Sequence, residues 1–422
     1  MSEPEYDENV QHREIPFETT EEGRKLLIAK EICIMLMREC QTFNKLILDT
    51  RGFSRSLSIQ SVDYISIPNL PNAINCLINL TKFVCGGEFF KGEIFHTMAN
   101  YCYNLDSISI VDTFHPAINE LANLILVQRN LRKFNWIGGY GDLTPIIISF
   151  SSQFEYLEEI QLANAFFQDF KALEGLANCQ NLEILKIAEC HLTSLHVKPL
   201  VNVNFPHLKI LEITDIHDAY DFEQEEAPDP PSEEIISIIR NANRQLRDVR
   251  LNLELHFYPG IIETVGISCP NLQTFAANIK TDEQVSELMN LLSSCRQLEN
   301  LIICGYSWSN FFPADYILPE IGAILPKMLT HLDLTKWTFE AEALRKFLKN
   351  CKSSLEYMSW HCFISHEEHK SAIVEYSRKR GIGIKNLRVD VHDSGYGWHR
   401  CVCHISVEFE KSSDTNKDKE AK

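Results

Sequence analysis

The chain has 422 residues, and its 58 acidic and 40 basic residues give a formal net charge of −18. Hydrophobic residues make up 45% of it and charged residues 23%, the composition of an ordinary globular protein. The acidic balance disfavours a nucleic-acid partner, because phosphate binding requires clustered Lys and Arg. The longest apolar run, residues 32–37, is too short to cross a bilayer, so we expect no membrane association either.

Residues 1–22 are polar and acidic, and we expect them to be disordered. They have neither the basic start nor the apolar stretch of a secretory signal. The fourteen cysteines are spread along the chain. Without a signal, they are expected to be free thiols in a reducing, intracellular compartment, either cytoplasmic or nuclear.

An internal repeat is predicted over residues 23–385. The motif L-x-x-L-x-L, with any apolar residue at its three anchors, occurs thirteen times, and eight of the twelve intervals are 25 or 26 residues. The first anchors are Phe43, Leu80, Leu105, Leu131, Leu157, Leu182, Leu208, Leu246, Leu272, Leu298, Leu329, Leu355 and Ile384.

Each repeat reads as one strand followed by one helix. The L-x-L portion has a period of two, which predicts a short strand with one buried face. The residues after it follow a helical period; Val285, Leu288 and Leu292, for example, share one helical face. Such a unit cannot bury both apolar faces by itself, whereas stacked units can. The predicted fold is therefore an α/β, right-handed solenoid of about thirteen strand–helix repeats.

Six cysteines keep a fixed position relative to the repeat. Five lie three residues before a first anchor and the sixth lies four before: Cys40, Cys102, Cys179, Cys269, Cys295 and Cys351. There the helix ends and the chain turns into the strand, so a small buried residue with a weak S–H donor fits. A metal cluster would need ligands within a few ångströms of one another, and these thiols lie at least one repeat apart. We interpret them as structural.

The 26-residue period with Cys ahead of L-x-x-L-x-L resembles the cysteine-containing class of leucine-rich repeats, which is typical of F-box/leucine-rich-repeat proteins. Residues 43–50, 83–87 and 267–272 also resemble a large fungal group of such proteins. The resemblance covers about residues 23–392 and implies a leucine-rich-repeat horseshoe. In that family the F-box docks on the adaptor of a cullin–RING (SCF-type) ubiquitin ligase, and the repeats select the substrate.

The chain departs from this family at its start. An F-box usually opens with Leu-Pro and a following acidic residue, and it precedes the repeats. Here residues 23–40 already read as the first repeat helix, so the F-box is missing or truncated and we expect weak or no binding to the adaptor. The resemblance implies a substrate-recognition component of the ligase. The alternatives are a ligase-independent interaction scaffold and, from a third class, a GTPase-activating or other catalytic repeat protein.

Three long intervals predict insertions, at residues 49–71, 215–234 and 305–316. The second contains nine acidic residues and no Lys or Arg. It could be an acidic contact for a basic partner, or a solvated loop in which Pro228, Pro230 and Pro231 prevent a helix.

The C-terminal region changes pattern after Ile384. Residues 386–410 are predicted to form a hairpin that caps the last repeat, with Cys403, Ile405 and Val407 alternating along its second strand. Residues 411–422 form a charged tail that we expect to be disordered.

No recognisable catalytic or cofactor motif occurs in the chain, and we expect no enzyme activity, cofactor or metal. His399, Cys401, Cys403 and His404 lack a second Cys pair at zinc-site spacing, so a capping strand is the better interpretation. Residues 366–370 contain two histidines at helical spacing without a third ligand, and are expected to be an exposed helix start.

Side chains between the buried anchors should form three columns on the inner, concave face of the solenoid, with strands about 4.8 Å apart. These columns are polar and mixed in charge, which suits a folded protein partner better than a small molecule. The first includes Lys133, Glu159, Asp248, His331 and Tyr357, the second Lys186, Glu212, Arg250, Asp333 and Ser359, and the third Thr214, Asn278, Thr335 and His361.

The C-terminal rim of this face is the predicted partner site. The insertion after residue 304 carries four aromatic residues in seven positions, and aromatic anchors with polar neighbours are the usual make-up of an interface hot spot. The alternative is that Trp308, Phe311 and Phe312 fold back to cover the flank. The candidate partner-binding residues are Tyr306, Trp308, Phe311, Phe312, His331, Tyr357, His361, Arg250, Arg388, Tyr396 and Trp398.

Overall fold

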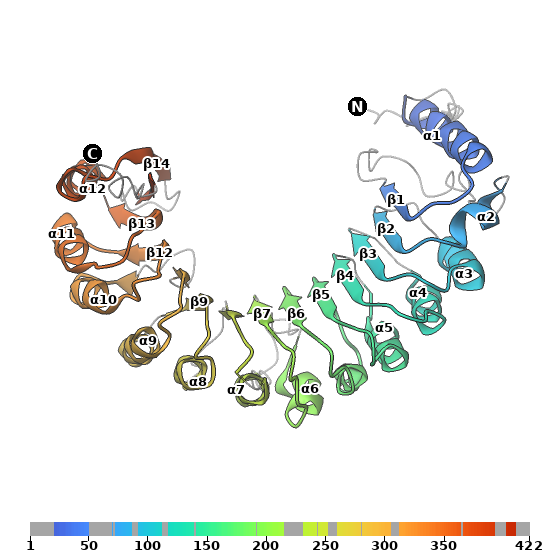
Figure 1. Cartoon of the computed structure of the whole chain (residues 1–422), viewed down its shortest axis with the longest axis horizontal. Helices are drawn as coiled ribbons and strands as arrows, with labels where there is room; N and C mark the ends of the chain where they lie inside the picture. Colours follow the sequence, from blue (N-terminus) through green and yellow to red (C-terminus); the bar gives the residue numbers. More distant parts are fainter. Residues whose placement is uncertain are drawn as a thin grey trace, which may run out of the picture. The chain divides into compact units, whose positions relative to one another are not determined.

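Short strands alternate with helices throughout the described part of the chain. The computed structural model describes residues 21–49, 70, 72–86, 92–111, 117–138, 141–190, 192–214, 231–242, 244–251, 260–279, 281–304, 312–363, 366–392 and 402–410. The chain divides into two compact units, residues 1–131 and 132–422. In each unit the strands lie on one side and the helices on the other (Figure 1). We call these sides the strand face and the helix face.

The first unit contains three parallel strands among its described residues. Its elements are α1 (Glu21–Glu39), β1 (Lys45–Asp49), α2 (Ala73–Leu77), β2 (Lys82–Gly86), α3 (Gly92–Tyr101), β3 (Ser107–Val111) and α4 (Ile118–Leu126). The strands pair in register, with Lys45 opposite Lys82 and Lys82 opposite Ser107. Successive repeats within this unit therefore align at the same motif position, as the repeat predicts.

The second unit continues the same alternation. Its first half contains β4 (Lys133–Ile137), α5 (Thr144–Ser149), the 3-10 helix η4 (Phe150–Ser152), β5 (Glu159–Ala163), η5 (Ala172–Leu176), β6 (Ile184–Ala188), α6 (Ser194–Val197), η6 (Lys198–Leu200), β7 (Ile210–Thr214), α7 (Ser232–Asn241) and β8 (Asp248–Leu251). Its second half contains α8 (Ile261–Ser268), β9 (Thr274–Asn278), α9 (Asp282–Ser294), β10 (Asn300–Cys304), β11 (Phe312–Pro313), α10 (Leu318–Ile324), β12 (His331–Thr338), α11 (Ala341–Asn350), β13 (Tyr357–Phe363), α12 (His366–Arg380), β14 (Ile384–His392) and β15 (Val402–Phe409).

The strands from β4 to β13 follow one another in chain order and are parallel, with the short β11 pairing beside β12. Leu185 in β6 stands opposite Leu211 in β7, and Leu211 aligns in turn with Val249 in β8. All three anchor side chains are fully buried, while the residues on either side of each are only half-buried. The period-two strand prediction and the α/β class are confirmed.

The repeat-linked cysteines lie between adjacent repeats. The Cys102 thiol donates to the Leu77 carbonyl at 3.2 Å, and the Cys295 thiol donates to the Cys269 carbonyl at 3.5 Å. Burial raises the pKa of Cys102 and Cys269 to about 12 and that of Cys295 to about 11. These thiols stay protonated at neutral pH, and those of Cys102 and Cys295 act as small buried donors at the helix-to-strand turn. Cys40, by contrast, is half-buried.

The parallel ladder ends in an antiparallel hairpin. β15 pairs antiparallel with β13, placing Ile405 opposite Trp360, and β14 pairs antiparallel with β15 on the outer side. The thirteenth motif, at Ile384, therefore lies in the edge strand β14 instead of extending the parallel ladder. Leu387 and Val389 on β14 are only half-buried, whereas Ile405 and Val407 on β15 are fully buried. The second strand of the hairpin is thus the one that covers the core.

Helix α12 begins with one buried histidine, which the sequence interpretation missed. Glu367 and Glu368 are exposed as expected, but His369 is fully buried, and its Nδ1 accepts a hydrogen bond from Trp360 Nε1 at 3.0 Å. Burial, together with the nearby Arg345 charge, lowers the pKa of His369 to about 4. The imidazole is therefore neutral and is part of the core beneath β13.

We expect His369 to make the fold less stable below neutral pH. The unfolded chain binds a proton on this residue near pH 6.5 and the folded chain only near pH 4, so stability falls as the pH drops through that window. Between pH 7.5 and 5.0 the loss should be about 2 kcal/mol, measurable by urea unfolding at both values. His369→Gln, whose amide oxygen can still accept from Trp360, should remove this part of the pH dependence. An equal loss in both proteins would contradict the assignment.

Candidate partner-binding surface

A stacked aromatic pair marks the strand face at the C-terminal end of the second unit. His331 on β12 stands opposite Tyr357 on β13, and their rings stack 4.3 Å apart at an interplanar angle of 11°. The next residue on each strand, Leu332 and Met358, is fully buried against the helix side, so alternation directs His331 and Tyr357 to the strand face. Both side chains remain half-buried and accessible.

The protonation state of His331 suits this stacking. Its partial burial lowers the pKa of the imidazole, and the Asp333 carboxylate two residues along offsets only part of that shift. The ring is therefore mainly neutral at pH 7, as a flat partner for the tyrosine. A neutral imidazole offers one donor and one acceptor beside the phenol hydroxyl, so the pair combines apolar area with polar edges.

Asp333 organises the polar part of the surface. Its Oδ1 accepts from the Thr335 backbone N–H at 3.0 Å and from the Ser359 hydroxyl at 2.7 Å, and the Thr335 hydroxyl donates to the same oxygen. The Ser359 bond ties β12 to β13 through side chains, and the two Thr335 bonds fix the carboxylate on its own strand. The carboxylate is therefore held in one position on rigid strands, as a recognition surface requires.

The third column adds a pair of histidines that face each other across the antiparallel strands β13 and β15. His361 on β13 stands opposite His404 on β15, with ring centroids 5.1 Å apart, and His404 in turn stands opposite Asp390 on β14. We define the C-terminal strand surface as His331, Asp333, Tyr357, His361 and His404, with the buried Ser359 hydroxyl bonded to Asp333. It brings together three of the predicted partner-binding residues.

The other predicted residues are not all part of this surface. Arg250 lies on β8, where its guanidinium pairs with Asp248 of the same strand at 2.9 and 3.0 Å. This hydrogen-bonded pairing raises the pKa of Arg250. Arg388 is exposed on the edge strand β14. Phe312 on β11 packs on the fully buried Trp337, with centroids 5.1 Å apart, which favours the packing interpretation for this residue. Tyr306, Trp308, Phe311, Tyr396 and Trp398 lie outside the described residues.

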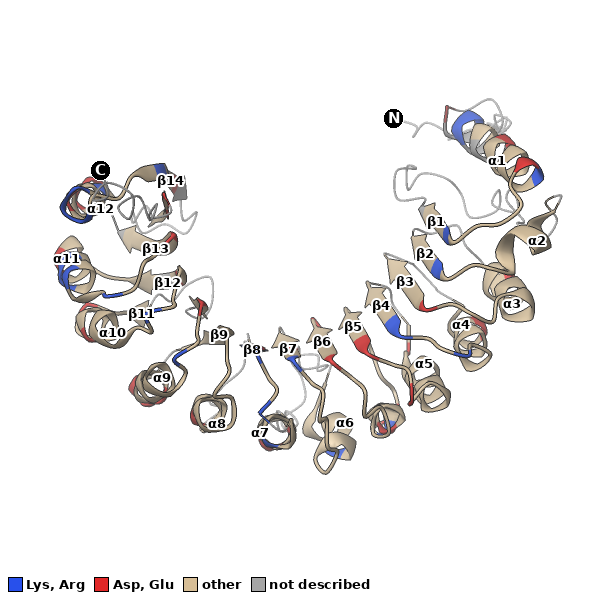
Figure 2. Cartoon of the chain, in the orientation of Figure 1, with Lys and Arg blue, Asp and Glu red and all other residues tan. Residues whose placement is uncertain are grey.

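Between β4 and β7 the charges on the strand face are largely paired. Lys133 pairs with Glu159 at 2.7 Å, and Lys186 pairs with Glu212 at 3.4 Å, each across adjacent strands. Acidic and basic positions accordingly lie side by side along these strands (Figure 2). Such half-exposed pairs contribute little to stability, and they leave little net charge for steering a partner.

Apolar side chains interrupt the columns, a feature that the list of polar candidates missed. The first column passes through Ile184 and Ile210, and the second through Ala276 and Ile302. The sequence contains enough information to find these apolar residues, because the motif spacing places them at the same positions as the polar residues of the neighbouring strands. In the second column, Ala276 and Ile302 therefore lie between Arg250 and Asp333 and separate two polar regions.

Neither a metal-binding cluster nor a membrane-spanning helix is present in the described ranges. No group of three or more His, Cys, Asp or Glu side chains there could hold a metal ion. No helix among those residues is long and apolar enough to cross a membrane.

Comparisons with known proteins yield no family assignment. No protein-family model matches the chain, and no curated protein matches it. Among solved structures, one match is described as the crystal structure of a TDR receptor, at 15% sequence identity and a TM-score of 0.29. The match covers 78% of this chain and 60% of the receptor chain, so this chain spans less than two thirds of that structure.

Proposed function

We propose that this chain is a protein-recognition module built as a right-handed leucine-rich-repeat solenoid of about thirteen repeats, acting inside the cell. Its partner would be a folded protein bound on the concave strand face toward the C-terminal rim. The observation that carries this proposal is the stacked His331–Tyr357 pair beside the fixed Asp333 carboxylate. An accessible aromatic pair with ordered polar neighbours on rigid strands is the composition of a binding hot spot.

The resemblance to F-box/leucine-rich-repeat proteins extends the proposal to one cellular role. The module would select substrates for a cullin–RING ubiquitin ligase. The alternative is a ligase-independent scaffold that uses the same surface. Co-purification with the ligase adaptor separates these roles, because only a ligase component must bind the adaptor. Weak or absent binding, as the sequence predicts, would favour the scaffold, and robust co-purification would favour the ligase role.

Replacing Tyr357 by Ala should weaken partner capture by about 2 kcal/mol or more, roughly a thirtyfold loss of affinity, because it removes the ring that stacks on His331 and aromatic rings dominate binding hot spots. Partners captured from a lysate by the unaltered chain would be identified by mass spectrometry. Their affinities for both proteins would then be measured by titration. The free energy of unfolding should change by less than about 1 kcal/mol, since the side chain is half-exposed.

Tyr156→Ala is the matched control, because this exposed tyrosine lies in the turn before β5, far along the chain from the surface. It should leave capture unchanged. Full affinity in a stable Tyr357→Ala, His331→Ala double variant would contradict the assignment of the partner site.

A further inference from the structure

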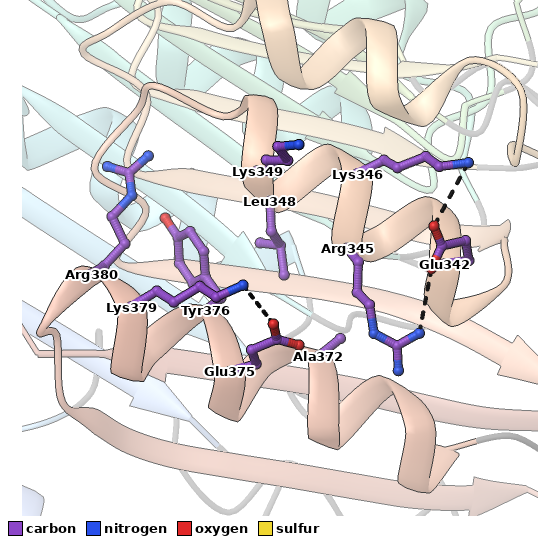
Figure 3. Close-up of a pocket in the computed structure, with 10 residues that line it drawn as sticks. All are labelled: Glu342, Arg345, Lys346, Leu348, Lys349, Ala372, Glu375, Tyr376, Lys379 and Arg380. Atoms are coloured by element: carbon purple, nitrogen blue, oxygen red, sulfur yellow. Dashed lines mark hydrogen bonds and ion pairs between the residues drawn. The ribbon is translucent and has the colours of Figure 1, made fainter.

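The helix face of the second unit contains a basic groove that the proposed function does not use. Helices α11 and α12 bound a groove of about 480 Å³ (Figure 3). Its charged lining consists of Arg345, Lys346, Lys349, Lys379 and Arg380 together with Glu342 and Glu375. The groove thus has a surplus of three positive charges in a chain whose net charge is −18. Lys and Arg gather on these two helices (Figure 2).

Ion pairs account for only part of this charge. Glu342 is shared by Arg345 at 3.6 Å and Lys346 at 3.8 Å, and Glu375 pairs with Lys379 at 2.6 Å. Lys349 and Arg380 have no carboxylate partner among the residues that the structure describes. Both lie in the last turn of their helices, where the partial negative charge of the helix end attracts cations. That attraction explains why cations gather here, but it does not explain a groove with a tyrosine in its wall.

Tyr376 also lines the groove. Tyr376 is 6% exposed, and its hydroxyl oxygen is buried without a hydrogen-bond partner in the described part of the chain. A buried phenol normally finds a partner, because an unsatisfied hydroxyl is costly. Burial raises the pKa of Tyr376, so the group remains a protonated donor. The Tyr376 ring extends from α12, and its hydroxyl points toward the Arg380 side chain (Figure 3).

Arg380 is held in place at this end of the groove. Its guanidinium donates to the carbonyl of Cys351, the residue that follows α11, and lies 5.5 Å from the centroid of the Tyr376 ring. The hydrogen bond joins the C-terminal ends of α11 and α12, so Lys349, two residues before Cys351, belongs to the same end. This end therefore contains a buried, unpartnered phenol hydroxyl beside a guanidinium and an ammonium group, of which the two cations are donors only.

We propose that this end of the groove binds a phosphate monoester, with Tyr376, Arg380 and Lys349 as hydrogen-bond donors. A phosphate dianion has three terminal oxygens and close to two negative charges, which match three donors. The two positive charges of Lys349 and Arg380 outweigh the partial negative charge of about −0.5 at each of the two helix ends. The volume is that of a small-ligand site. The phosphate group could belong to a free small molecule or to a phosphorylated side chain of a partner. The inference does not depend on the proposed function, because it rests on the opposite face.

Calorimetric titration of the full chain tests the proposal with three probes: inorganic phosphate, glycerol 3-phosphate and a phosphoserine peptide. Glycerol and the unphosphorylated peptide serve as matched blanks. We expect a phosphorylated probe to bind while its blank does not. Binding should weaken as NaCl is raised from about 50 to 200 mM, because salt screens the exposed cations. Binding of the peptide without the glycerol ester would identify a phosphorylated protein as the source, and binding of both would identify the phosphate group itself.

Three variants locate the site. Tyr376→Phe removes one hydroxyl and retains the ring packing on Phe409, whose centroid is 5.8 Å away, so the fold should be preserved. It should weaken binding about tenfold, as should Lys349→Gln, because each loses a hydrogen bond to a charged group. Lys171→Gln, an exposed lysine outside the groove, should have no effect.

Absence of binding by all three probes to the folded chain would overturn the proposal. Unchanged affinity in a folded Tyr376→Phe, Lys349→Gln double variant would do the same. Tighter binding of an Asp-rich peptide than of the phosphoserine peptide would overturn the assignment of phosphate as the ligand.

Discussion

Replacing Leu211 by Ala should lower the free energy of unfolding of the second unit by about 2–5 kcal/mol, the range for a buried leucine. Leu211 lies in the middle of β7, is fully buried, and stands in register between Leu185 and Val249 on the neighbouring strands. A truncated side chain there leaves a cavity that cannot collapse, because the repeats on both sides hold the strands in place. Chemical denaturation followed by circular dichroism measures the effect.

Ile210→Ala is the matched control, because it removes hydrocarbon from the adjacent residue of the same strand. Ile210 is half-buried on the strand face, so its loss should cost less than about 1 kcal/mol. Equal costs at the two positions would mean that the burial alternation of β7 is wrong, and with it the assignment of the strand face.

Gly175→Ala should destabilise the second unit by on the order of 3 kcal/mol, because the new Cβ has no room. Gly175 lies in η5, and an ideal Cβ there would be 2.0 Å from the carbonyl oxygen of Ile147 in the neighbouring helix α5. A backbone oxygen cannot rotate away, so the two helices would have to separate. The shift in thermal midpoint and in denaturant midpoint reports the cost.

Gly92→Ala provides the contrast in α3. A Cβ at this position would lie 3.0 Å from Cγ of Glu120, which belongs to a flexible side chain, and 3.1 Å from Cβ of Ala117, a distance that a small shift relieves. The substitution should change stability by less than about 1 kcal/mol. A Gly175→Ala protein as stable as Gly92→Ala would contradict the close approach of η5 and α5.

The two proposed surfaces lie on opposite faces of the second unit and can be separated experimentally. Tyr357 is on the strand face of β13, whereas Tyr376 lines the groove between α11 and α12 on the helix face. Tyr357→Ala should therefore leave phosphate binding unchanged, and Tyr376→Phe should leave partner capture unchanged. Failure of one proposal would not affect the other.

Much of the C-terminal strand surface follows from motif spacing. The anchors Leu329 and Leu355 are 26 residues apart, so the positions two residues after them, His331 and Tyr357, are predicted to lie side by side, and they do. The stacking of the two rings and the Asp333–Ser359 hydrogen bond could not be predicted, because they depend on rotamers chosen within the packed sheet.

The sequence by itself determined the repeat, the strand and helix alternation and the buried anchors, because each depends on local periodicity: two residues in a strand, 3.6 in a helix and 26 between units. It also assigned Cys102 and Cys295 to the helix ends, since their position relative to the next anchor is fixed. Only the tertiary structure decided that β15 inserts between β13 and β14, that His369 is buried beneath Trp360, and that α11 and α12 bound a groove beside Tyr376. These features arise where elements from different repeats meet, and the periodicity of a single repeat contains no information about how their side chains pack.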